Sequence, residues 1–542
     1  MNTKLVSKYF ILFSLTLLIS HPVFSQEKNK PNILFIAIDD LKPILGCYGN
    51  TIIKTPNIDR LAKMGTVFMN NYCQQAVCGP TRASLMTGKR PDYTQVWDLK
   101  TKMRDINPDI LSLPQYLITQ GYSTQGIGKV YDSRCVDKKM DEPSWSVPYY
   151  NYFKTEEKYY AKETGMPVLG AYQSAETKEL AIKFRKEAQE KGLSEKEIDD
   201  YVSKMVKPSI ECVDVPDNAY NDGANALRAM EILEKLKTEN KPFFFAVGFS
   251  KPHLPFVSPK KYWDLYKRDD IPVAPFQEKS KNGVDVAYHN SGEIRAYTDI
   301  PELISFTDQK EFGLTLPIEK QKELIHGYSA AISYTDAQVG KLLDKLDALD
   351  LTKNTIVVIW GDHGWHLGDH NLWCKHTNFE QATHAPLIIS APGLKGTVSK
   401  AQTEFIDIFP TLCDLSGVKI PETVDGKSLK PLMNKTLKSV KEFSISQYPR
   451  SGNNAESERQ GYASSKVMGY SLKNSSYRFT IWMGNNFRSN QPFNADWIVG
   501  TELYDYEKDP NETINVVNEE AYKAVSKELK GKMLAFFKSQ VK

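Results

Sequence analysis

The sequence predicts an α/β fold whose main sheet is largely parallel. Three short apolar runs have the pattern of buried strands, and each ends in polar side chains: residues 33–38 before Asp39 and Asp40, residues 355–360 before Asp362 and His363, and the run KPFFFAVGF before Lys251 and His253. Helical segments lie between these runs. Strands that alternate with amphipathic helices are typical of a parallel sheet covered by helices.

The clearest helical segment is SYTDAQVGKLLDKLDALD, at residues 333–350. Its apolar side chains Val339, Leu342, Leu343 and Leu346 recur at the three- and four-residue spacing of one helix face. We therefore expect this helix to pack against the sheet.

The length of 542 residues predicts more than one domain. We expect the main domain at residues 26–437 and a smaller α/β subdomain at 438–542, where the short strands EFSISQY and YRFTIWM and a final helix from Glu519 indicate an antiparallel sheet. The aperiodic stretch HNSGEIRAYTDIPELISFTDQ, residues 289–309, is predicted to be a long loop over the site.

The stretch from about residue 149 to 216 is charged and helical, and we interpret it as a helical insertion packed on the main domain. Ser194 and Glu197 form a capping-box pattern. The predicted buried face of the helix that follows comprises Ile198, Tyr201, Val202, Met205 and Val206.

Residues 1–25 have the pattern of a cleaved secretory signal peptide. Lys4 and Lys8 precede an apolar stretch at residues 9–19, and Ser25 ends a small-residue cleavage site. That stretch is too short to span a membrane. We expect a periplasmic or secreted protein with no membrane association.

The composition is that of a chain without a general attraction for polyanions. A hydrophobic content of 41% and a charged content of 25% are those of an ordinary globular protein. Loss of two lysines with the signal peptide lowers the net charge of +3 to about +1. Such a chain has no general attraction for nucleic acid, so an anionic substrate must be recognised locally.

Seven cysteines show neither CxxC pairs nor zinc-like spacing. In an exported protein some of them can form disulfides, but the odd number leaves at least one thiol unpaired. We predict that Cys78 is unpaired.

The polar residues that follow two of the strands predict a metal site. Asp39, Asp40, Asp362 and His363 should meet at the carboxyl edge of the sheet. Three carboxylates lie together only with a compensating cation, and this oxygen-rich set suits Ca²⁺ or Mg²⁺ better than zinc. The alternative is that each pair merely caps the following helix.

Five of the nine histidines fall within residues 363–384. A single histidine is more often a structural hydrogen-bonding group than a ligand. We assign that structural role to His366 and His370.

The stretch AVCGPTRASLMTGKRP, residues 76–91, predicts a helix that Pro80 helps to start and Gly88 ends. Cys78 would then lie at the helix N-terminus, where backbone N–H groups favour anions. Arg82 returns to the same side one turn later and can neutralise a nearby charge. The alternative is a buried cysteine beside a surface arginine.

These residues resemble those of the formylglycine-dependent sulfatases, and within that family the iduronate-2-sulfatase-like branch. The CxPxR pattern is CGPTR from Cys78 to Arg82, with Thr81 where Ser or Ala is commoner. The stretches AIDDLKPILGCYGN, GYSTQGIGKVYD, GFSKPHLPF, GDHGWHLGDHNLWCKHTNFEQATHAPLI and ELYDYEKDPNETIN are similar to that branch in the same order. The resemblance thus covers nearly the whole chain.

The resemblance implies an alkaline-phosphatase-like sulfatase fold and conversion of Cys78 to formylglycine (3-oxoalanine) by a formylglycine-generating, or sulfatase-maturing, enzyme. It makes Asp39, Asp40, Asp362, His363 and modified Cys78 the ligands of a divalent metal, usually calcium. Its further implied roles are stabilisation of the formylglycine hydrate and of the sulfate by Arg82 and Lys129, protonation of the departing sugar oxygen by His253, and binding of a sulfate oxygen and of a sugar carboxylate by Lys375.

Two further candidates are Asp132 and Arg450. Asp132 stands where the branch often has a histidine that helps to expel sulfate, so it either acts as a base or pairs with Lys129 or Arg134. Arg450, in QYPR, is a candidate contact for an acidic sugar, with a structural salt bridge as the alternative.

The resemblance implies an exported sulfatase whose substrate is a sulfated oligosaccharide. Our first hypothesis is removal of a 2-O-sulfate from a terminal iduronic or unsaturated uronic acid in heparin- or chondroitin-type fragments. Three alternatives remain open: a sulfatase for another polysaccharide such as an algal galactan, a phosphate or phosphonate ester hydrolase of the same superfamily, and a sulfated-glycan-binding protein without catalysis.

Overall fold

The computed structural model describes residues 30–540 except 151–155, 301–314, 452–465, 485–486 and 488–493. The predicted signal peptide, residues 1–25, lies outside the described residues.

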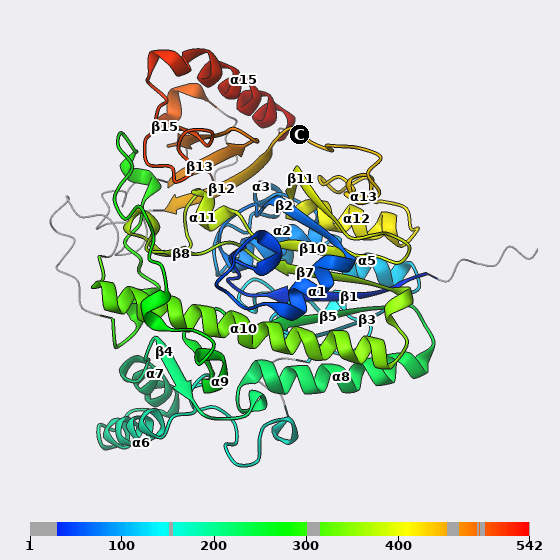
Figure 1. Cartoon of the computed structure of the whole chain (residues 1–542), viewed down its shortest axis with the longest axis vertical. Coiled ribbons are helices and arrows are strands. Elements are labelled where there is room, and N and C mark those ends of the chain that lie inside the picture. Colours follow the sequence, from blue (N-terminus) through cyan, green and yellow to red (C-terminus); the bar gives the residue numbers. More distant parts are fainter. Residues whose placement is uncertain are drawn as a thin grey trace, which may run out of the picture.

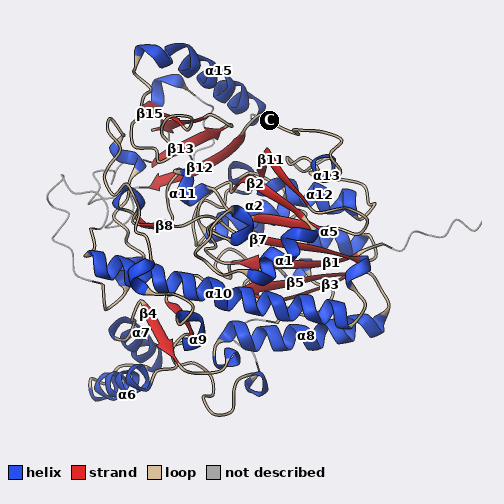
Figure 2. Cartoon of the chain, in the orientation of Figure 1, coloured by secondary structure: helices blue, strands red, loops and turns tan. Residues whose placement is uncertain are grey.

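A seven-stranded sheet forms the centre of the molecule (Figures 1 and 2), in the order β11-β2-β10-β7-β1-β5-β3. Its strands are β1 (Asn32–Ile38), β2 (Thr66–Tyr72), β3 (Ser123–Gly128), β5 (Phe243–Phe249), β7 (Thr355–Gly361), β10 (Leu387–Ser390) and β11 (Thr397–Glu404). Only β10 runs antiparallel to its neighbours in this sheet, β2 and β7. The prediction of a largely parallel sheet is confirmed.

The three strands recognised in the sequence are central neighbours. In parallel register, Ile38 at the end of β1 lies beside Phe249 of β5 and Gly361 of β7. The polar residues that follow these strands therefore emerge together at one edge of the sheet.

Helices cover both faces of this sheet (Figure 2). Leu34, Ile36 and Ile38 of β1 share a core with helices α1 (Pro56–Met64), α8 (Asn221–Glu239) and α10 (Ile318–Ala348). The alternate β1 residues Ile33, Phe35 and Ala37 pack with helices α2 (Cys78–Thr87), α5 (Leu113–Thr119) and α12 (Ile408–Leu415). This alternation is the two-residue period of a strand buried on both faces.

The predicted helix at residues 333–350 forms the second half of α10, and all four residues of its predicted apolar face are buried. The short elements around the main sheet are α3 (Pro91–Thr94), α4 (Met103–Ile106), α9 (Lys260–Trp263), α11 (Glu380–Thr383), α13 (Lys430–Met433), β4 (Ile210–Val213), β6 (Phe256–Pro259), β8 (His366–Leu367) and β9 (Trp373–Cys374).

The charged stretch before β4 contains a helical hairpin, α6 (Ala175–Glu190) and α7 (Glu195–Met205), at the lower left of Figure 1. Ser194 and Glu197 make the expected capping box. Ile198, Val202 and Val206 are buried, but Met205 is 39% exposed, so its predicted burial is wrong. The backbone leaves helical geometry at Val206 (φ −128°), and that side chain takes the buried position instead.

A separate four-stranded antiparallel sheet lies at the top of Figure 1, and α15 (Lys523–Gln540) packs on it through Leu529, Met533 and Phe537. Its strands are β12 (Ser444–Ser451), β13 (Lys466–Lys473), β14 (Tyr477–Met483) and β15 (Ile498–Asp505). The expected smaller subdomain with an antiparallel sheet is therefore present, while its boundary at residue 438 stays a prediction. Within the described residues, no helix has both the length and the apolar character needed to cross a membrane.

Candidate active site

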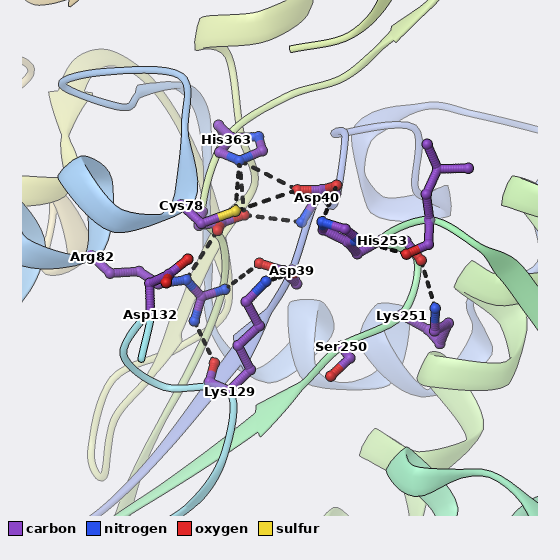
Figure 3. A network of polar contacts seen from close by, with 12 residues as sticks. Asp39, Asp40, Cys78, Arg82, Lys129, Asp132, Ser250, Lys251, His253 and His363 are labelled. Atoms are coloured by element: carbon purple, nitrogen blue, oxygen red, sulfur yellow. Dashed lines mark hydrogen bonds and ion pairs between the residues drawn. The ribbon is translucent and has the colours of Figure 1, made fainter. Parts of the chain in front are cut away.

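Side chains from five segments meet at the carboxyl edge of the central strands (Figure 3). Asp39 and Asp40 follow β1, and Asp362 and His363 follow β7. Asp40 has a positive φ of 58°, and its backbone N–H donates to Asp362 Oδ1 at 2.9 Å. That bond ties the two strand ends together.

Cys78 begins helix α2 and faces the polar residues of both strand ends (Figure 3). Its Sγ lies 3.5 Å from His363 Nε2 and 3.8 Å from Asp40 Oδ1, and its side chain is buried. Helix α2 ends at Gly88, in the left-handed conformation with φ 65°, as the sequence predicts. Burial, with the charge of Asp39, raises the pKa of the Cys78 thiol well above its ordinary value.

Four of the five predicted metal ligands form one compact group. Asp40, Cys78, Asp362 and His363 each offer a ligand atom, and these atoms lie within 4.8 Å of one another. Two carboxylates suit a hard divalent cation such as Ca²⁺ or Mg²⁺, and an oxygen in place of the Cys78 sulfur would suit it better. The residues present therefore fit the implied metal, with Asp40, Asp362, His363 and position 78 as its holders.

The fifth predicted ligand, Asp39, is paired with two basic side chains, Arg82 and Lys129. Its Oδ1 accepts from Arg82 Nη2 at 2.8 Å, and its Oδ2 accepts from Lys129 Nζ. Although burial raises the pKa of Asp39, the charges of Lys129 and Arg82 outweigh that effect and hold the pKa well below its usual value. Asp39 also belongs to a second possible ligand group, with Asp40 and His253.

Arg82 is completely buried at the centre of these charges. Besides Asp39, it donates from Nε to Asp362 Oδ2 at 3.0 Å and from Nη1 to the carbonyls of Lys129 and Val130. The guanidinium therefore bridges the two carboxylates, which excludes the alternative of a surface arginine.

Lys129 reaches the site because β3 and β5 approach closely at their ends. Gly128 has a φ of 77°, and a Cβ there would lie 2.0 Å from the carbonyl oxygen of Gly248. Only glycine fits this contact, and the Lys129 backbone N–H donates to the same oxygen at 3.0 Å.

His253 is the most accessible of the predicted catalytic side chains around this cluster. Its Nδ1 lies 2.6 Å from the carbonyl oxygen of Leu254, which makes Nδ1 the donor and turns Nε2 into the site. Nε2 lies 3.7 Å from Asp40 Oδ2, and 26% of the side chain is exposed. This position suits a proton donor that meets a substrate.

Lys375 lies deeper and is 3% exposed. Its Nζ donates to both carboxylate oxygens of Asp40, at 3.2 and 3.1 Å, and to Glu293 Oε1 at 2.9 Å. Glu293 also lies 3.3 Å from His253 Nε2. The sequence reasoning missed Glu293, because the loop that carries it has no periodicity from which a site residue could be recognised.

Asp132 is paired with Arg134. Arg134 donates to it from the backbone N–H, Nε and Nη2, at 3.0, 2.9 and 2.6 Å. Burial raises the pKa of Asp132, but the hydrogen bonds from Arg134 and the charge of Lys129 outweigh it and lower the pKa to about 2. This geometry favours the ion-pair interpretation over the base.

Arg450 is 6% exposed and donates to three main-chain carbonyls, those of Val286, Ala287 and His376, at 2.8–2.9 Å. These bonds join β12 of the second sheet to two loops near the site. The geometry favours a structural role through these carbonyls, and the sugar contact and the salt bridge both stay predictions.

His366 and His370 lie outside the cluster. His366 Nε2 is 2.8 Å from Thr377 Oγ1, and the ring of His370 stacks on Phe379 at 4.5 Å. Both contacts suit the structural role expected of them. All seven cysteines lie among the described residues and are free thiols there, Cys78 included.

The fold and site together define a hydrolase built to hold a tetrahedral anion among buried cations. The chain belongs to the sulfatase family, whose model matches residues 31–418, and it is a sulfuric ester hydrolase. It is 32% identical to the iduronate 2-sulfatase of Homo sapiens, over 90% of this chain and 91% of that protein.

Solved structures share the fold. One is of a protein in complex with its substrate D-glucosamine-2-N,6-O-disulfate, with a TM-score of 0.67, 20% identity and coverage of 95% of this chain and 99% of that one. Another is a phosphonate monoester hydrolase of Agrobacterium radiobacter, with a TM-score of 0.66, 21% identity and coverage of 94% and 96%. They support the alkaline-phosphatase-like sulfatase fold.

Proposed function

We propose that this sulfatase is exported and removes a sulfate ester from a sulfated glycan fragment, with the 2-O-sulfate of a terminal iduronic or unsaturated uronic acid as the first candidate. The observation that carries the proposal is the buried cluster in which Cys78 faces Asp40 and His363, with Arg82 bridging Asp39 and Asp362. The similarity to an iduronate 2-sulfatase over 90% of the chain supports the choice of sugar.

The proposed nucleophile is Cys78 after its conversion to formylglycine by a sulfatase-maturing enzyme, because the hydrated aldehyde supplies an oxygen nucleophile that a buried thiol does not. A divalent cation, most simply Ca²⁺, would polarise the sulfate and be held by Asp40, Asp362, His363 and position 78, with Asp39 beside them. This chain's own residues supply the remaining chemistry.

Arg82 and Lys129 bring two fixed positive charges to one side of Cys78, and both are held by Asp39. Lys375 brings a third charge on the side of Asp40. Fixed charges in a buried site stabilise the equatorial oxygens of a reacting sulfuryl group without reorganisation.

His253 is proposed to protonate the departing sugar oxygen. Its Nδ1 is fixed by the Leu254 carbonyl, so the proton moves from Nε2 to the ester oxygen as the sulfur–oxygen bond breaks. Sugar hydroxyls are poor leaving groups, and general acid catalysis of this kind contributes about 10²–10⁴-fold.

The proposed roles of Asp132 and Arg450 follow their contacts. Asp132 orients Arg134 and adds a charge near Lys129, and Arg450 holds the loops at residues 286–287 and 376. A phosphate or phosphonate ester hydrolase stays an alternative, which comparative turnover of sulfate and phosphate esters of one alcohol separates.

The decisive test is the mass of the tryptic peptide from residue 64 to 82, taken from protein made in its native host. Conversion of Cys78 to formylglycine lowers that mass by roughly 18 Da relative to the thiol. We expect this shift, followed by hydrolysis of an unsaturated 2-O-sulfated uronate disaccharide in a panel that includes sulfated galactan fragments. An unmodified thiol in the native protein would contradict the proposed mechanism.

A further inference from the structure

One carboxylate oxygen lies between the two proposed substrate-facing side chains, Lys375 and His253. Glu293 Oε1 is 2.9 Å from Lys375 Nζ and 3.3 Å from His253 Nε2. Lys375 comes from the turn after β9 and His253 from the turn after β5, so Glu293 joins two segments that are far apart in the sequence.

Lys375 and His253 have a second carboxylate neighbour, Asp40, but that carboxylate is also a candidate metal ligand. Asp40 lies 3.1 Å from Lys375 and 3.7 Å from His253, and it belongs to both possible metal-ligand groups. A carboxylate that binds a divalent cation has less charge to offer to neighbouring donors. Glu293 belongs to neither ligand group found among the described residues, so it is a partner that metal binding leaves in place.

Glu293 is a charged group in this environment. Burial raises the pKa of its carboxyl, but Lys375 and His253 outweigh burial and lower the pKa well below its usual value. Its second oxygen, Oε2, faces His376 Nε2 at 3.8 Å and has no hydrogen-bond partner among the residues that the structure describes. The Glu293 side chain is 21% exposed, but its carboxylate points inward between Lys375 and His253, so this residue is poorly explained as mere filling of the loop.

The segment that carries Glu293 is fixed to the rest of the site. Ser291 Oγ accepts from the backbone N–H of Trp373 at 3.0 Å, two residues before Lys375. Ile294 is completely buried in the core that also contains Trp373 and Leu254. These contacts fix the chain on both sides of residue 293 and thereby limit the positions open to its carboxylate.

We propose that Glu293 is a positioning residue that holds Lys375 and His253 at the sulfate ester, an inference that rests on the roles given to these two residues in the proposed function. One oxygen fixes the ammonium group of Lys375 and the Nε2 side of His253 relative to each other. Glu293 itself does not contact the sulfuryl group, whose negative charge it would repel.

The test compares Glu293→Ala and Glu293→Gln with the wild type and with Glu234→Gln, a control that removes a 54% exposed glutamate from α8. The substrates are an unsaturated 2-O-sulfated uronate disaccharide and 4-nitrophenyl sulfate, whose leaving group needs no proton. Melting temperature and the formylglycine content of each preparation correct the rate constants for folded, matured protein.

We expect Glu293→Ala to lower kcat for the disaccharide about 100-fold, the loss typical of a catalytic group misplaced by about 1 Å. The kcat of Glu293→Gln should be about tenfold higher than that of Glu293→Ala, because the amide oxygen of glutamine still accepts from Lys375 and His253. KM should stay the same or fall in both variants, because a negative charge near an anionic ester is removed. The loss for 4-nitrophenyl sulfate should be smaller, since His253 matters less there.

Three outcomes would overturn the inference: a kcat equal to that of the control, a rise in KM at unchanged kcat, or losses that vanish after correction for folded protein. His253→Ala and Lys375→Ala separate this inference from the proposed function. If those two variants keep the wild-type kcat, the roles given to His253 and Lys375 in the proposed function are wrong. If they lose it while Glu293→Ala does not, only the role of Glu293 is wrong.

Discussion

Removal of Arg82 should destabilise the protein strongly in the absence of a divalent cation. Its guanidinium pairs with Asp39 and Asp362 at 2.8 and 3.0 Å, and all three side chains are completely buried. Arg82→Met keeps the aliphatic stem but leaves two buried carboxylates without this partner. Breaking a buried pair in this way costs about 3–5 kcal/mol in the free energy of unfolding.

The assay is urea-induced unfolding followed by tryptophan fluorescence, in EDTA and in excess calcium chloride. The matched control is Arg185→Met, which breaks pairs with Glu195 and Asp199 at a guanidinium that is 42% exposed. An exposed pair contributes less than about 1 kcal/mol. The deficit of Arg82→Met should therefore exceed that of the control several-fold in EDTA.

Calcium should reduce the deficit of Arg82→Met, because a bound cation compensates the carboxylates that lost their arginine. It should leave the deficit of Arg185→Met unchanged. Equal deficits of the two variants in EDTA would refute the argument that Arg82 is the charge that keeps these carboxylates together.

The remaining predictions concern the metal, the acid and the aspartate at position 132. Calcium should raise the urea midpoint of the wild type, and Asp40→Asn and His363→Ala should lose that increase, because both residues belong to the ligand group; a full increase in both would contradict the assignment. His253→Ala should lower kcat for the disaccharide by about 10²–10⁴-fold and lower it less for 4-nitrophenyl sulfate, whereas equal losses would exclude a general acid. Asp132→Asn should cost at most about 2 kcal/mol at pH 7, since the pKa is lowered from 3.8 to about 2 in the folded protein. A carboxyl whose pKa is lowered by folding stabilises the folded protein at pH values above the pKa of the unfolded chain. The deficit should therefore persist at pH 5 and shrink as the pH falls from 3.8 towards 2. Unfolding curves measured across that pH range check this.

Local sequence determined the framework of the site. Apolar runs of strand length set where β1, β5 and β7 end, and parallel strands that are neighbours deliver the residues after them to one edge. The start of α2 at Cys78 and its end at Gly88 follow from the proline and glycine around that helix. For this reason the strand ends alone predict that Asp39, Asp40, Asp362 and His363 lie together, whereas Cys78 is placed among them by the resemblance to the sulfatases.

Only the tertiary structure decided which charges meet across the site. Arg82 could be placed on the side of Cys78, but its burial between Asp39 and Asp362 depends on contacts to residues 43 and 280 positions away. The sequence left two alternatives each for Asp132 and Arg450, and the structure pairs Asp132 with Arg134 and Arg450 with three main-chain carbonyls. Glu293 comes from an aperiodic loop, where no repeat of apolar residues reports which way a side chain points. In a helix or strand, the periodic spacing of apolar residues shows which face is buried. A loop has no such spacing, and the partners of its side chains depend on the distant segments that the fold brings beside it.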